Sequence, residues 1–325
     1  MTATVLAAGQ RPAQRRWLSL VAIWLALITA PLWLPLMGGY PALAGKVLVF
    51  GLAAMGFNLL LGFTGVLSFG HAAYFGLGAY GAGLMLKYVT PSTPLAMLAG
   101  ILLGGLAGTL FSMLIVRRRG VYFAMCTVAF GQIFYYIAYS WNDFTGGFDG
   151  LRGFHRAPIG LGPLSLDITD SIAFYYFTLA VFAVAVALMA LLIASPFGRT
   201  LRAIRENERR ARFLGIPVER HIWLSFSISA FFTALAGTLY ALLNNFADPL
   251  TLHYSLSGYF VIMTVMGGMR SFWGPLLGAL VFVVLQDYIS SLTVNWMSFV
   301  GLIFILVVLF FPRGILGILK RRGAT

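Results

Sequence analysis

Cysteine is almost absent from this chain of 325 residues, which contains Cys126 alone. One cysteine cannot form an intrachain disulfide or a metal-binding cluster, so we expect no metal site. Acidic side chains are also scarce, at nine against 22 Lys and Arg, and only Asp287 falls near a long apolar run. A stand-alone secondary transporter or channel needs a carboxylate or carbonyl site within the membrane. The scarcity of acidic residues therefore argues against that class.

Catalytic and nucleotide-binding patterns are missing as well. The four histidines are scattered and no carboxylate cluster lies within an apolar run, so the sequence offers no catalytic constellation. The segment Gly45-Lys46-Val47 lacks the upstream glycine and the Ser or Thr of a phosphate-binding P-loop. We therefore expect no catalytic residue in this chain and no ATP hydrolysis by it.

Apolar residues dominate what is present. Hydrophobic side chains make up 60 % of the chain, and the mean hydropathy is +0.90. Several runs approach or exceed the roughly 20 apolar residues that cross a bilayer. A net charge of +13 could mark a nucleic-acid binder, but the basic residues lie at the ends of apolar runs, where the positive-inside rule explains them better. The sequence indicates an all-α, polytopic transmembrane bundle in the lipid bilayer that binds no nucleic acid.

Charged and Gly- or Pro-rich points divide the chain into about ten candidate spans. These are residues 17–37, 46–62, 71–87, 95–116, 121–141, 171–194, 222–243, 252–269, 272–290 and 296–312. With the N-terminus in the cytoplasm, 18 of the 22 basic residues fall on the cytoplasmic side, and Lys46, Lys87, Arg152 and Arg156 fall outside. One omitted helix would move every later loop to the opposite side of the membrane and destroy this asymmetry. We therefore expect ten spans with both termini in the cytoplasm.

This topology predicts two tails and one membrane domain with a loop on each side. The bounds are 1–16 for the N-terminal tail, 17–312 for the membrane domain, 142–170 for its extracytoplasmic loop, 195–220 for its polar cytoplasmic segment and 313–325 for the basic tail. The first apolar run is longer than a signal-peptide core and lacks a small-residue cleavage site after it. We expect it to be an uncleaved first span.

Two Gly-rich regions interrupt the expected helices. Nine glycines fall between Gly51 and Gly83, and the stretch 62–71 is too polar and too rich in glycine for a continuous helix. Within 244–274, only about eleven residues are cleanly apolar, which favours a tilted, broken or re-entrant element. These glycines either serve close helix packing or form a pair of interrupted hairpins that face a central path.

The cytoplasmic segment has the pattern of one amphipathic helix. Ser195 can cap it, Pro196 suits its first turn and Gly215 can end it. Arginines at three- or four-residue steps share one face, and apolar residues make another. These arginines are Arg199, Arg202, Arg205, Arg209 and Arg212. Such a helix either lies on anionic lipid or docks in a cleft of a soluble partner.

Polar residues within apolar runs are candidates for a translocation path, because a membrane tolerates them at a cost. They are Asn58, Thr64, Ser68, His71, Gln132, Asn244, Asn245 and Gln286. Each could instead bond across helices or brace a turn. In the outer loop, a turn-forming group provides either an ordinary loop or an external gate or docking site. This group is Thr145, Gly146, Gly147 and Asp149.

Several motifs in a fixed order carry a resemblance to a known family. They are GFNLLLGFTG at 56–65, SFGHA at 68–72, GLGAY at 76–80, RRGVYFA at 118–124, TGGFDGL at 145–151, SPFGR at 195–199 and AIRENE at 203–208. Over about residues 45–312 the chain resembles the LivM-type permeases of branched-chain amino acid ATP-binding-cassette importers. The same superfamily includes permeases for urea, short-chain amides and aromatic acids.

The resemblance implies an importer of the bacterial inner membrane, with two permeases and two ATPases. An extracytoplasmic solute-binding protein would deliver the substrate, and the second permease would be either an identical copy or a LivH-like sister. ATP and Mg²⁺ would bind to the ATPases, so we expect no cofactor in this chain. The implied substrate is a branched-chain or related amino acid, with urea, short-chain amides and aromatic acids as alternatives.

The resemblance also implies a loop of the EAA type, which docks on the ATPase, at residues 206–215. Where the family has Glu-Ala-Ala, this chain has Arg209-Arg210-Ala211, which leaves the detailed contacts open. The implied coupling residues are Arg205, Glu206, Asn207, Glu208, Arg209 and Gly215. The implied mechanism is alternating access, in which closure of the ATPases moves this segment and reorients the Gly-rich hairpins.

Overall fold

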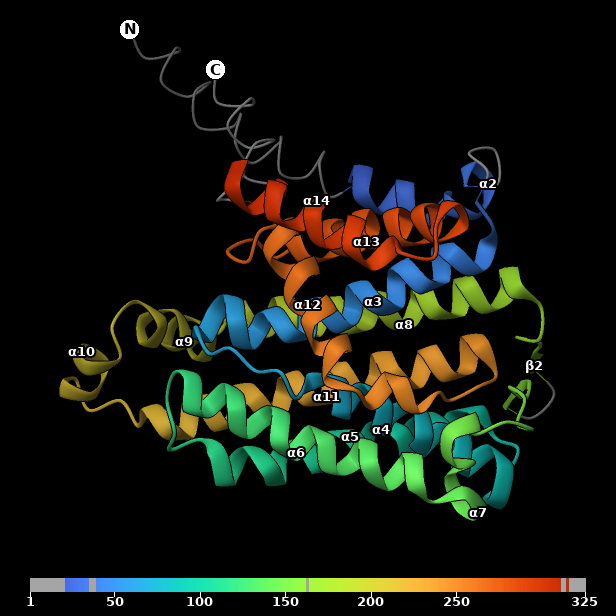
Figure 1. The fold of residues 1–325 in the computed structure, drawn as a ribbon, viewed down its shortest axis with the longest axis horizontal. Helices are drawn as coiled ribbons and strands as arrows, with labels where there is room; N and C mark the ends of the chain where they lie inside the picture. Colours follow the sequence, from blue (N-terminus) through green and yellow to red (C-terminus); the bar gives the residue numbers. More distant parts are fainter. Residues whose placement is uncertain (1–20, 35–38, 162–163, 311–313, 316–325) are drawn as a thin grey trace, which may run out of the picture.

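The computed structural model describes residues 21–34, 39–161, 164–310 and 314–315 (Figure 1). Most of the helices run side by side between two ends. Helices α9 (Pro196–Glu206) and α10 (Glu208–Phe213) lie at one end, and α7 (Asn142–Thr145) and strand β2 (Leu164–Leu166) lie at the other (Figure 1). We call these the α9 end and the α7 end.

Among the described residues, six helices are long and apolar enough to cross a membrane. They are α3 (Pro41–Asn58) with its π-helical continuation η2 (Leu59–Thr64), α5 (Thr93–Ile115), α6 (Val121–Ser140), α8 (Ser171–Ala194), α11 (Val218–Asn244) and α13 (Gly274–Leu292). Other helical elements are 21–28, α2 (Ala30–Trp33), α4 (His71–Leu84), η3 (Met85–Val89), η4 (Gly147–Asp149), η5 (Pro249–Leu252), α12 (Tyr254–Gly267) and α14 (Trp296–Phe310). The chain is a multi-pass membrane protein.

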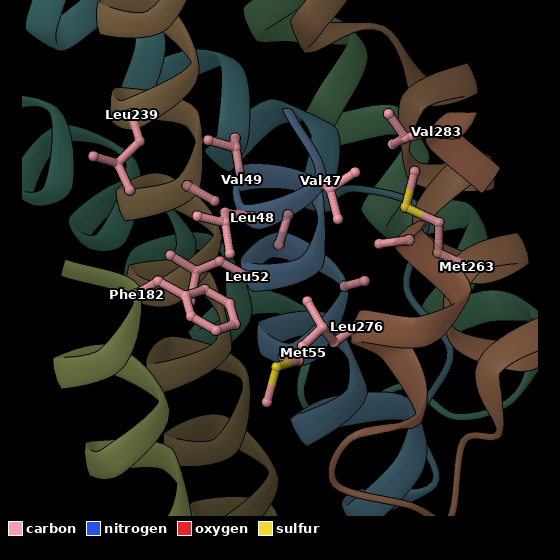
Figure 2. Packing of buried hydrophobic residues seen from close by; sticks show 14 of the residues in the cluster. Val47, Leu48, Val49, Leu52, Met55, Phe182, Leu239, Met263, Leu276 and Val283 are labelled. Atoms are coloured by element: carbon pink, nitrogen blue, oxygen red, sulfur yellow. The ribbon is translucent and has the colours of Figure 1, made fainter. Parts of the chain in front are cut away.

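Helix α3 forms the centre of the bundle. Of its most apolar stretch 89 % is buried, against 28–33 % for α5, α6, α8 and α13. In Figure 2, Leu52 of α3 lies beside Phe182 of α8, and Met55 lies beside Leu276 of α13. A helix that is apolar on every side needs cover on every side, which places α3 inside and the less buried helices at the periphery.

Small residues allow the inner helices to approach closely. Helix α11 packs along α3, α4 and α5. A Cβ on Gly104 of α5 would lie 2.6 Å from the carbonyl oxygen of Tyr74, and one on Gly237 of α11 would overlap the carbonyl oxygen of Phe75. Backbone contact at small residues is typical of helix association in membranes.

Every expected span contains a helix wherever the structure describes it. The tails 1–16 and 313–325 lie outside the described residues, apart from 314–315, as do 17–20 and 35–37 of the first expected span. The outer loop differs from the all-α expectation, because strand β1 (Ile159–Leu161) pairs with β2 in an antiparallel hairpin. Leu151 also pairs with Ala247 in an isolated bridge. These pairings satisfy backbone groups that a loop of this length would otherwise leave to water.

Candidate functional site

The first Gly-rich region breaks a helix where the sequence predicts a break. Helix η2 ends at Thr64, Gly65 has a φ of +83°, and the helix resumes at His71. This left-handed conformation suits glycine, since it lacks a Cβ. The hydroxyl of Thr64 donates to the carbonyl of Leu59 and lies 2.6 Å from the hydroxyl of Ser225 on α11. We call residues 65–70 the first break.

Buried polar side chains surround the start of α4. In His71, Nδ1 lies 3.0 Å from Oγ of Ser68, and Nε2 lies 2.9 Å from Oγ of Ser229. The hydroxyls of Ser257 and Thr127 accept hydrogen bonds from the backbone N–H groups of residues 72 and 69, at 2.8 and 3.0 Å. A helix that starts inside an apolar core needs such partners for its free N–H groups. His71 and Ser68 therefore hold the first break in this conformation.

The sequence predicts Thr64 and His71 as site residues, but their serine partners on α11 were missed. Ser225 and Ser229 lie four residues apart on α11, so both face the same side of that helix. Two hydroxyls at helical spacing within an apolar run are a signal that the sequence contains. Ser257 on α12 offers no such pattern, because only the tertiary fold brings it to the start of α4.

The second Gly-rich region breaks the chain between α12 and α13. Helix α12 ends at Gly267, Gly268 has a φ of +115°, and α13 begins at Gly274. A Cβ on Gly267 would overlap the carbonyl oxygen of Gly274, so the two helix ends touch through their backbones. We call residues 268–273 the second break.

The end of α3 and helix η2 meet the second break in space, although some 200 residues separate them. The amide Nδ2 of Asn58 donates to the carbonyl of Ser271 at 3.2 Å. A Cβ on Gly62 would overlap both Oδ1 of Asn58 and the carbonyl oxygen of Met269. Asn58 is buried, and its Oδ1 has no hydrogen-bond partner among the described residues. Asn58 therefore connects the end of α3 to the second break.

Helix α9 lies directly against η2. Leu201 is fully buried among the apolar side chains of η2, and the guanidinium of Arg205 donates a hydrogen bond to the carbonyl of Gly62. Burial, and to a smaller extent the like charge of Arg270, lowers the pKa of Arg205. An arginine starts from so high a pKa that the guanidinium stays protonated.

The cytoplasmic segment is two helices, and the single amphipathic helix that the sequence suggests is wrong. Ser195 caps α9 as expected, but α9 ends at Glu206 and Asn207 is extended. The side chain of Asn207 accepts from the backbone N–H of Arg210 at 2.9 Å and so caps α10. Asparagine favours helix N-termini, because its side chain competes with the helical backbone for hydrogen bonds.

An ion network holds α10 against the bundle. Glu208 lies 2.9 Å from Nε of Arg119 on the α5–α6 turn and 2.8 Å from Arg212. Arg212 also lies 2.6 Å from Glu219 of α11. The other expected coupling residues of this region, Glu206 and Arg209, are exposed. Glu208 thus orients α10 through its ion pairs, whereas Glu206 and Arg209 are the residues exposed to a partner.

The tip of the cytoplasmic segment is an exposed apolar pair. Phe213 is 91 % exposed and Leu214 is 74 % exposed, next to Gly215 with a φ of +80°. The positive φ reverses the chain after α10. Two large apolar side chains are therefore presented at the α9 end beside the exposed Arg209 and Arg210.

A cavity of about 900 Å³ lies between the first break, the start of α6 and helices α9 and α10. Its lining is mainly apolar, with Val66, Phe69 and Val128 among the contributors. Thr64 and Arg205 also line it. Of the expected path residues, Thr64 therefore lines this cavity, whereas Ser68 and His71 are not among the lining residues.

The remaining expected path residues do not line this cavity. The amide of Asn245 accepts from the backbone N–H of Arg156 at 3.1 Å, and the amide of Asn244 donates to its own helix at Tyr240. Gln132 on α6 is half-buried, and its Nε2 has no partner among the described residues. Gln286 is half-buried on α13.

The expected gate residues form a compact turn at the α7 end. Thr145 donates to the carbonyl oxygens of Ala138 and Trp141, both at 2.6 Å. Gly146 and Gly147 have φ values of +81° and +56°. Asp149 is exposed in the same turn, and its neighbour Phe148 is 71 % exposed. The turn thus presents an aromatic and an acidic side chain to the outside of the bundle.

Comparison with known proteins gives consistent matches. A family model described as a branched-chain amino acid transport system permease component matches residues 40–309. The chain is 27 % identical over 294 residues to the high-affinity branched-chain amino acid transport system permease protein LivM of Escherichia coli, which covers 84 % of this chain and 69 % of that protein. It is 33 % identical over 127 residues to LivH of Salmonella typhimurium, which covers 38 % and 40 %. No solved structure matches the chain. The chain belongs to the family of branched-chain amino acid transport permease components.

Proposed function

We propose that this chain is a permease subunit of an ATP-binding-cassette importer, and that it carries branched-chain or related amino acids across the bacterial inner membrane. The family match over residues 40–309 carries this proposal. The apolar bundle supports a subunit that forms the path, and the sequence lacks a P-loop. ATP and Mg²⁺ would bind to partner subunits, and this chain would be non-catalytic.

The proposed topology has ten spans and both termini in the cytoplasm. The α9 end carries most of the arginines of segment 195–220, and the outer loop 142–170 lies at the opposite end (Figure 1). The positive-inside rule places the arginine-rich end in the cytoplasm. The α7 end would then face the solute-binding protein, with Phe148 and Asp149 in the contact region.

The proposed ATPase contact is the tip of the cytoplasmic segment. Leu201, Ile204 and Ala211, which make the apolar face of α9 and α10, are buried within the protein. The alternative of a helix lying on lipid needs that face to be free for the bilayer. Phe213 and Leu214 are exposed instead, which suits insertion into an apolar cleft of a soluble partner. Matches to both LivM and LivH support a LivH-like sister as the second permease.

The proposed inner end of the path is the cavity at the first break. Its apolar lining suits an aliphatic side chain, and Thr64 supplies a hydroxyl at its edge. Asn58, Ser68 and His71 would reach the path only when the two breaks move. Weak binding of the cargo along the path would suit release into the cytoplasm after delivery by a high-affinity binding protein.

The first experiment is purification of the tagged chain from native membranes in mild detergent, with mass spectrometry of its stoichiometric companions. We expect two ATPase chains and a second permease. Uptake of labelled leucine, competed by unlabelled isoleucine, urea, acetamide or benzoate, would then distinguish the substrate classes. A chain recovered alone and monodisperse would overturn the importer assignment.

A further inference from the structure

Arg205 points into the protein, although it lies in the segment expected to meet the ATPase. Its guanidinium donates to the carbonyl of Gly62. That carbonyl lies in the last turn of η2, where carbonyl groups lack partners within the helix. A cation also suits the negative end of the helix dipole. The bond therefore satisfies a helix end, and no partner protein is needed to complete it.

The contact continues from η2 to the second break. A Cβ on Gly65 would lie 2.8 Å from Cγ of Arg205, so the arginine stem rests on the first break. At the next contact, Asn58 and the carbonyl of Met269 pack so closely against Gly62 that a side chain there would not fit. The amide of Asn58 then bonds to the carbonyl of Ser271. One continuous set of contacts joins α9, the first break and the second break.

We propose that Arg205 is a latch that holds both helix breaks in one arrangement, and that movement of α9 releases it. This inference rests on the proposed importer function for the source of that movement, and it makes Arg205 a positioning residue. Displacement of α9 would break the bond from Arg205 to Gly62 and remove the arginine stem from Gly65. The hydrogen bond between Asn58 and Ser271 would then be able to open. Arginine suits the role because a charged donor makes a stronger hydrogen bond than a neutral one, here at a partly buried carbonyl.

The first test uses the full chain without partners. Cys126→Ser removes the native thiol, and Ser271→Cys places a reporter thiol on the half-exposed second break. In inside-out vesicles, the labelling rate by a charged maleimide reports opening of the break. Arg205→Ala should raise this rate about tenfold, the factor that loss of one charge-assisted hydrogen bond allows.

Two further variants keep this test decisive. Arg205→Lys, which retains a charged donor, should give a smaller increase. Asn58→Ala removes the second link of the same set of contacts and should also speed labelling. Arg199→Ala changes an exposed arginine on the same helix and serves as the matched control. Equal labelling rates in the parent, Arg205→Ala and Asn58→Ala would overturn the latch.

The second test uses the assembled importer in proteoliposomes. Arg205→Ala should lower the number of substrate molecules imported per ATP hydrolysed by several-fold while hydrolysis continues, and Arg205→Lys should restore part of it. An unchanged ratio would show that the latch does not couple the two processes. If the labelling rates change as expected but no ATPase co-purifies, the latch stands and the importer assignment falls.

Discussion

Among single residues, His71 has the most complete set of contacts in the candidate site. It is fully buried, and each ring nitrogen faces a serine hydroxyl. Ser229 in turn donates to the carbonyl of Gly56 at 2.6 Å, so the imidazole links α4, α11 and α3. A buried polar group left without a partner costs more than the bond itself contributes. This imidazole therefore stabilises the position of the break.

We expect His71→Ala to lower the free energy of unfolding by about 1–3 kcal/mol, because it leaves buried hydroxyls unpaired. Denaturation of the purified chain, followed by circular dichroism in mixed micelles, measures this. His155→Ala changes an exposed histidine of the outer loop and should have little effect. Equal stability of the His71 and His155 variants would show that the imidazole does not hold the break.

The sequence located the arginines of the cytoplasmic segment but not their directions. Periodicity treats Arg205, Arg209 and Arg212 as one face, yet they bond to a backbone carbonyl, face water and join an ion network, respectively. The kink at Asn207 separates them, and a local capping preference sets this kink. A helical period alone cannot report such a change of direction.

At the scale of elements, composition predicted both breaks. Glycine-rich and polar stretches cannot continue a helix in a membrane, so the positions of the interruptions follow from the sequence. That the end of α3 touches the second break does not follow, because the contact between Asn58 and Ser271 spans 213 positions of sequence. The short hairpin of β1 and β2 was also missed, since three-residue strands carry too little alternation to recognise.

Glycines on one helix allow a matched test of the second break. We expect Gly267→Ala to destabilise the chain by about 1–3 kcal/mol and to slow uptake, since its Cβ would overlap backbone that cannot move aside alone. Gly258→Ala lies on the same helix, where a Cβ meets nothing within 4 Å among the described residues. It should be neutral or stabilise by about 0.5–1 kcal/mol. Similar yield, stability and uptake for the two variants would contradict close packing at this break.

For the whole molecule, charge is the guide to orientation. Few acidic residues offset the arginines of segment 195–220, so this segment is strongly basic. The structure places segments 142–170 and 195–220 at opposite ends of the bundle, as an odd number of crossings between them requires (Figure 1). The orientation of the bundle in the membrane stays a prediction of the positive-inside rule.

Single thiols on a Cys126→Ser background test this orientation. We expect Asp149→Cys to react with an impermeant maleimide in spheroplasts and Phe213→Cys to react only in inside-out vesicles. Both positions are exposed, so neither should fail for lack of access. The reverse pattern would invert the expected topology, and the tip of the cytoplasmic segment could then not be the proposed ATPase contact.

The exposed tip of the cytoplasmic segment has a consequence for the life of the protein in the cell. Burial of an aromatic or leucine side chain is worth about 1.5–3 kcal/mol each, and Phe213 and Leu214 forgo that gain until a partner covers them. A newly made subunit whose tip no partner covers would expose these two apolar side chains to water. Chaperones and proteases that bind exposed apolar surfaces would then remove surplus copies, so the abundance of this permease would follow that of whichever partner covers the tip.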